Sequence, residues 1–197
     1  WETDPENASK VVDENGEPLV VYHGSPSLNI DVFDRTKSER VSSGLKEFGT
    51  YFSTNPNLST LYAETTGKTE KGRVYPVFLN LKEIEKFNGN EEVNIDAWKN
   101  LEVNVGYKFA TGRDAMEALA GKNRMAPKLK VDGIKAENII EMSIGMSSQP
   151  IKYKKTQEYK DAKEKYLGDA YLVFDGQPEN IKLADGSNKT FDPDAPS

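Results

Sequence analysis

The chain contains no cysteine and a single histidine, His23. Without cysteine there can be no disulfide, no thiol nucleophile and no zinc ion held by thiolates. One imidazole cannot supply a metal cluster built from several histidines. Zinc enzymes and cysteine proteases are therefore excluded as function classes, and we expect no metal.

Long apolar runs are also missing, because apolar stretches such as 19–22 and 77–79 are far shorter than the roughly 20 residues that span a bilayer. We expect no membrane association. Lys and Arg number 26 against 32 Asp and Glu, a net charge of −6, so the average surface repels phosphate backbones and disfavours nucleic acid binding by bulk charge. The chain begins at Trp1 without Met or a signal pattern, so we expect an excised domain or a processed product.

The 197 residues, of which 36% are hydrophobic and 29% charged, suit one domain over 1–197. Segments of about 82–130 and 138–167 look like inserted or variable parts. Short strands and irregularly placed helices indicate an α+β fold rather than alternating βαβ units. We expect strands at 19–22, 49–53, 73–81, 131–134, 139–144, 170–174 and 181–183, and helices at 55–64, within 82–128 (opening at Asn94 and Gly112) and within 152–165.

His23 stands at the end of the first expected strand, before Gly24, Ser25 and a long loop over 26–48. Glycine lets another group approach the backbone closely, and loops of this length often bind ligands. Taken alone, His23 is more often a packed or capping residue, and Gly24 more often ends a strand. The functional interpretation therefore needs further motifs.

Two such motifs follow along the chain. In the strand 49–53, period-two alternation sends Tyr51 and Ser53 to one face. In the next helix, Ser59 and Tyr62 are three residues apart and hence neighbours on one helix face. Singly, each has an ordinary structural explanation as a core aromatic or a solvated helix residue.

Taken in order, His23-Gly24-Ser25, the strand 49–53 and Ser59-x-x-Tyr62 resemble the NAD-binding core of ADP-ribosyltransferases of the diphtheria-toxin and poly(ADP-ribose) polymerase type. That group uses a His, Tyr, Glu triad. The wider frame, from 15–18 to 171–175, resembles the ADP-ribosyltransferase domains of phage polyvalent and MuF-type proteins and of polymorphic toxins. The resemblance implies split antiparallel β-sheets with short helices around an NAD cleft.

The resemblance also implies roles for residues. The backbone of Gly24, with Ser59, would hold the carboxamide of NAD, and Tyr51 and Tyr62 would stack on the nicotinamide ring. His23 would hydrogen-bond the ribose on the adenine side. NAD would be a substrate, and the absence of a Gly-x-Gly-x-x-Gly loop argues against a hydride-carrier fold. The NAD-binding candidates are Gly24, Ser25, Ser53, Ser59 and Tyr62.

The third triad position departs from the pattern. In the relatives a Glu immediately precedes the strand that is 171–174 here, and this chain has Ala170 there, preceded by Asp169. Three explanations stay open: an inactivating substitution in a toxic enzyme, which we favour, a naturally inactive relative, or Asp169 acting through a shifted strand. The last needs a β-bulge, because a shift of one residue reverses the face. Glu179 is a weaker substitute.

We therefore expect a mono-ADP-ribosyltransferase, toxin-like or phage-borne, that transfers ADP-ribose from NAD to a macromolecular acceptor and is inactive as written if Ala170 abolishes catalysis. A host protein is the expected acceptor, and nucleic acid stays open. The protein would be monomeric, secreted or phage-delivered, and would act in a target-cell cytoplasm. The alternative is a non-catalytic nucleotide-binding or interaction module of the same fold. A retaining glycosidase or nuclease is a third possibility that the many acidic residues leave untested.

Overall fold

The computed structural model describes residues 8–33, 49–64, 72–88, 93–94, 108–109, 131–139, 157–174 and 180–184. Its strands and helices are β1 (Val21–Ser25), β2 (Gly49–Ser53), α1 (Pro56–Glu64), β3 (Arg73–Leu79), β4 (Ile84–Asn88), β5 (Val93–Asn94), β6 (Lys108–Phe109), β7 (Gly133–Ile139), α4 (Gln157–Tyr166), β8 (Gly168–Phe174) and β9 (Ile181–Leu183). In the described part of the chain, neither helix is long and apolar enough to cross a membrane.

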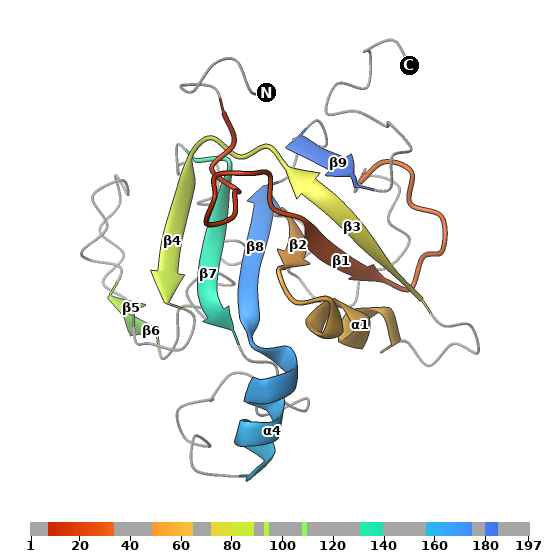
Figure 1. Cartoon of the computed structure of the whole chain (residues 1–197), viewed down its shortest axis with the longest axis vertical. Helices are drawn as coiled ribbons and strands as arrows, with labels where there is room; N and C mark the ends of the chain where they lie inside the picture. Colours follow the sequence, from red (N-terminus) through yellow and green to blue (C-terminus); the bar gives the residue numbers. More distant parts are fainter. Residues whose placement is uncertain are drawn as a thin grey trace.

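One mixed sheet dominates the fold, with its seven strands in the order β4-β7-β8-β2-β1-β3-β9 (Figure 1). β5 and β6 form a separate antiparallel pair. Helix α1 lies beside β1, and α4 leads directly into β8 (Figure 1). In the part of the chain that the structure describes, strands and helices do not alternate as βαβ units, which confirms the expected α+β class.

The sheet is split between β1 and β2. These strands share one residue pair, Tyr22 opposite Ser53, although β1 pairs with β3 along its whole length and β2 does the same with β8. Figure 1 shows that β4, β7 and β8 run nearly vertically, whereas β1 and β3 cross the view diagonally. The two halves therefore meet at one end of β1 and β2 and separate beyond it, as the expected split fold requires.

One cluster of buried hydrophobic residues lies on one face of the sheet. Alternation along β1 and β3 sends Val21, Tyr75 and Val77 to this face, where they are almost completely buried. Phe52 and Tyr171, which pair across β2 and β8, extend the same core. The other face carries α1 against β1, so the strand residues between these core positions face the helix. The sheet thus places His23 on the core side and Gly24 on the helix side.

Several expected elements are confirmed. Strands lie at 49–53 and 181–183, and helices occupy 56–64 and 157–166. The first strand is shifted, because the pairing with β3 continues to Ser25 opposite Arg73. The third strand ends at Leu79, since Asn80 and Leu81 bond to Asn180 and to the Ser9 hydroxyl instead.

The expectation of helices within 82–128 is wrong at the positions that the structure describes. Ile84–Asn88 is strand β4, and Asn94 lies in β5 rather than at a helix start. Asp132 Oδ2 accepts hydrogen bonds from the backbone N–H groups of Lys82 and Glu83 at 2.7 and 3.0 Å. Because Asp132 directly precedes β7 and Glu83 directly precedes β4, these bonds hold the two strands side by side. β4 and β7 are parallel, so the sheet is mixed rather than purely antiparallel. The helix expected at Gly112 lies outside the described residues.

The strands expected at 131–134 and 139–144 also need correction. One continuous strand, β7, covers Gly133–Ile139, and residues 140–144 lie outside the described part. The pairing of β7 with β8 is interrupted by a bulge between Ala136 and Ile139, where Asn138 has a positive φ of 59°. This bulge is on β7, and its position bears on the acidic residue discussed below.

Candidate functional site

Gly24 lies beyond the one residue pair that joins β1 to β2, and we call this unpaired stretch the β1–β2 opening. Pro76, opposite Tyr22 on β3, turns its carbonyl toward β9 and accepts a hydrogen bond from the Ala184 N–H at 2.9 Å. Tyr22 and Pro76 are therefore a non-hydrogen-bonded pair, so the backbone groups of Tyr22 and Gly24 turn toward β2. Because the pairing with β2 ends at Ser53, the N–H and C=O of Gly24 face the opening.

His23 bridges the same opening from the core side. Its Nδ1 lies 2.7 Å from the carbonyl oxygen of Tyr51. Because a carbonyl only accepts, Nδ1 carries the proton and Nε2 is the acceptor nitrogen. Burial lowers the pKa of His23 below its ordinary value, and the bond to Tyr51 offsets part of that effect. The imidazole is therefore neutral at pH 7, with its orientation fixed by β2.

Aromatic rings surround His23. Phe33 meets the imidazole edge-on with centroids 5.2 Å apart, and Phe52 lies at 5.5 Å. The hydroxyl of Tyr75, the residue opposite His23 on β3, donates to the Ser27 carbonyl at 2.7 Å and accepts from the Ile30 N–H at 3.2 Å. Tyr75 thus ties the start of the loop after β1 to the sheet, beside the imidazole.

Helix α1 covers the opposite side of Gly24. The helix begins after Asn55, whose side-chain oxygen accepts from the Asn57 N–H at 2.9 Å as an N-cap. A β-carbon on Gly24 would lie 1.7 Å from the Ser59 carbonyl oxygen, so only glycine permits this packing. The close approach expected at Gly24 is thus made by the helix itself.

Ser59 and Tyr62 project from α1 with different exposure. The buried hydroxyl of Ser59 donates to the Tyr22 carbonyl at 2.8 Å. Because its proton is used there, Ser59 Oγ can offer only lone pairs to another group. Tyr62 is 49% exposed, so its ring presents a large surface for contact.

Position 170 lies on the same face as Tyr51. Ala170 pairs with Ser53 of β2 and with Ala136 of β7, and Tyr51 pairs with Leu172. Paired residues share a face, and so do residues two apart on one strand. The strand register therefore aligns residue 170 with Tyr51 and Ser53, next to the half of the sheet that carries Gly24.

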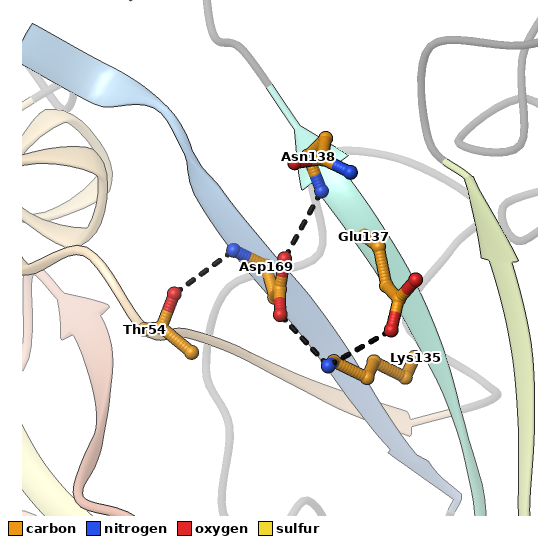
Figure 2. A network of polar contacts seen from close by, with 5 residues as sticks. All are labelled: Thr54, Lys135, Glu137, Asn138 and Asp169. Carbon is orange, nitrogen blue, oxygen red and sulfur yellow. Dashed lines mark hydrogen bonds and ion pairs between the residues drawn. The ribbon is translucent and has the colours of Figure 1, made fainter. Parts of the chain in front are cut away.

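Asp169 points to the opposite face from residue 170, as strand alternation requires. Its carboxylate contacts Lys135 at 2.8 Å and accepts from the Asn138 N–H at 3.0 Å (Figure 2). The bulge that the sequence argument required occurs, but on β7 rather than on β8. Asp169 caps that bulge, and this geometry does not favour it as a substitute for the missing Glu. Glu179 lies outside the described residues.

Asp169 belongs to a network of ion pairs centred on Lys135. Lys135 contacts both Asp169 and, at 3.1 Å, Glu137 (Figure 2). Burial alone would lower the pKa of Lys135, but the hydrogen bond to Asp169 and the other contacts outweigh it and raise that pKa. Burial raises the pKa of Tyr171, whose ring lies 5.8 Å from the Lys135 ammonium. Lys135 thus stays charged and anchored.

Ser25 and Ser53 both hold turns. Ser25 Oγ accepts from the Ser27 N–H at 3.1 Å, and Ser53 Oγ accepts from the Asn55 N–H at 3.0 Å. Each hydroxyl can still donate one hydrogen bond. Both side chains are buried. Ser25 directly follows Gly24, and Ser53 is the residue of β2 that pairs with Tyr22.

Sequence reasoning missed Thr54, Lys135 and Tyr75, and saw in Asn55 only a helix cap. No local pattern marks the first three. Each has a partner far away along the chain, as in the contacts of Thr54 and Lys135 with Asp169. Within the described residues there is no group of three or more His, Cys, Asp or Glu side chains that could hold a metal ion.

The split, mixed sheet with its two described helices fits the α+β fold that the resemblance to ADP-ribosyltransferases implies. A family model described as ADP-ribosyltransferase in polyvalent proteins matches residues 13–191. The match covers most of the chain, so the protein belongs to this family. Comparison with curated proteins and with solved structures gives no match.

Proposed function

We propose that this domain binds NAD at the β1–β2 opening, as the precursor of an ADP-ribosyl transfer. The observation that carries the proposal is the orientation of Gly24, whose backbone donor and acceptor face the opening. An amide needs such a pair, because it has both a carbonyl to accept and an N–H to donate. Ser59 Oγ, limited to accepting by its bond to Tyr22, would take the second carboxamide N–H.

The remaining residues suit the rest of the dinucleotide. The exposed ring of Tyr62 offers a stacking surface for nicotinamide, with Tyr51 as the expected second ring. His23 is neutral, and its Nε2 would accept from a ribose hydroxyl. Transfer breaks the bond between nicotinamide and ribose, the leaving base keeps the electron pair, and the acceptor attacks the oxocarbenium-like carbon and loses its proton.

Position 170 is where this chain differs from a competent enzyme. A carboxylate there would stabilise the positive charge that develops on the ribose, and alanine offers no such group. We infer that the domain as written binds NAD but transfers ADP-ribose poorly or not at all. The same residue favours the second candidate, a non-catalytic nucleotide-binding module of the same fold.

The acceptor and the setting of the reaction are proposed on the resemblance alone. A macromolecule, with a host protein first and nucleic acid second, would take the ADP-ribose. The domain would act as a monomer in a target-cell cytoplasm after secretion or phage delivery.

The first experiment measures binding and restores the acid. Calorimetry should detect NAD and nicotinamide binding to the wild-type domain, and Tyr62→Ala should lose most of it with little change in melting temperature, because this side chain is half exposed. Ala170→Glu should then produce NAD glycohydrolase activity, measured as nicotinamide release, that the wild type lacks.

Ala170→Gln is the matched control, because it has the size of Glu without the charge and should stay inactive. Absence of NAD binding to the wild type would contradict the proposal. A folded, NAD-binding Ala170→Glu protein without activity would leave only the non-catalytic module. Labelling of an acceptor by the wild type would show that another group performs the work assigned to position 170.

A further inference from the structure

Asn55 joins two parts of the molecule that carry different functional positions. Its side-chain oxygen caps α1, the helix of Ser59 and Tyr62. Its Nδ2 donates to the carbonyls of Lys165 and Leu167, at 3.1 and 2.9 Å. Those carbonyls lie at the end of α4 and in the link to β8. One amide group therefore satisfies the start of one helix and the end of another.

Thr54 forms a second connection, to Asp169 at the start of β8. Its N–H donates to the Asp169 carbonyl and its hydroxyl accepts from the Asp169 N–H, both at 2.9 Å. The Asp169 side chain continues the connection to Lys135 and Asn138 of β7 (Figure 2). Thr54 thus holds the backbone of Asp169, and the Asp169 carboxylate holds the backbone N–H of Asn138, so little freedom remains for either side chain.

We propose that Thr54 and Asn55 are positioning residues that couple α1 to the start of β8. This coupling holds the nicotinamide-binding side chains of α1 at a fixed distance from residue 170, two residues beyond the link. The inference rests on the proposed function for the ligand involved. In this proposal Asp169 fixes the backbone before residue 170 and does not replace the missing catalytic Glu.

Asn55→Asp tests the coupling selectively. Aspartate keeps an acceptor that caps α1, but it has no donor for the carbonyls of Lys165 and Leu167 and would repel them. Asn57→Asp is the matched control, since it makes the same change two residues along the helix and breaks only a contact of 3.4 Å to the Lys165 carbonyl.

Calorimetry with nicotinamide and with NAD, and hydrogen exchange with and without nicotinamide, give the readouts. In the wild type, nicotinamide should slow exchange in α1 and also in the link at 165–168. Asn55→Asp loses both hydrogen bonds to the link, so it should weaken binding on the order of tenfold and should confine protection to α1. Asn57→Asp, which loses one long contact to the link, should change the affinity much less than Asn55→Asp does.

The outcomes separate this inference from the proposed function. If Asn55→Asp retains wild-type affinity, or if protection in the wild type never reaches the link, the coupling is refuted. If neither ligand binds the wild type, the proposed function fails, and exchange in the unliganded proteins decides the coupling. Faster exchange in both α1 and 165–168 of Asn55→Asp supports it, and acceleration in only one of them overturns it.

Discussion

Gly24→Ala should move α1 and thereby destroy the nicotinamide site. The new β-carbon would lie 1.7 Å from the Ser59 carbonyl oxygen and 2.7 Å from its carbon, where contacts below 3.0 Å do not persist. The difference between 3.0 and 1.7 Å means that the helix backbone must retreat by roughly 1.3 Å. No rotamer change can absorb this, since both partners are backbone.

Two effects follow from that displacement. Overpacking of this kind costs about 1–3 kcal/mol, and each kcal/mol lowers the melting temperature by about 2–4 °C in a domain of this size. The same displacement moves Ser59 away from Gly24, so nicotinamide affinity should fall by about tenfold, the equivalent of one lost hydrogen bond. Calorimetric melting and titration with nicotinamide measure the two effects separately.

Gly16→Ala is the control for stability. Gly16 has a φ of 81° and nothing within 4 Å of the position of a new β-carbon. Alanine there costs about 1–2 kcal/mol of backbone strain but leaves α1 in place, so nicotinamide affinity should be unchanged. Equal nicotinamide affinities of Gly24→Ala and the wild type would refute the reasoning.

Two further predictions concern pH. Burial lowers the pKa of His23, so the unfolded state binds more protons than the folded state. The contribution of the neutral imidazole to the free energy of unfolding is therefore complete above pH 6.5 and declines as the pH falls toward the folded pKa. Urea unfolding at pH 7.5 and 5.5 should show a smaller decline for His23→Gln, and a ring that titrates at or above 6.5 by NMR would contradict this. The pKa of Lys135 is raised, so its contribution is complete below pH 10.5 and declines above it. Lys135→Met should cost about 1–2 kcal/mol at pH 7 and remove that alkaline decline, and an unchanged alkaline slope would count against the ion pair with Asp169.

Local patterns were sufficient for elements that depend on neighbouring residues. Asn55 followed by Pro56 predicted the start of α1, because a cap and a fixed φ act within one turn. The ordered motifs around His23 and Tyr51 predicted the split fold, and the family match supports it. The error in β4 has the opposite cause, since its strand conformation depends on Asp132, about fifty residues away.

The sequence alone determined which side chains are available: one imidazole, no thiol, and alanine at the place of an expected acid. Only the tertiary structure decided that Asp169 faces Lys135 instead of the opening, because a strand's pairing partners fix which face each residue occupies. It also decided the second role of Asn55, whose contact with Leu167 spans 112 positions of the chain. Such contacts arise from the packing of whole strands and helices, so the residues next to each partner in the sequence do not predict them.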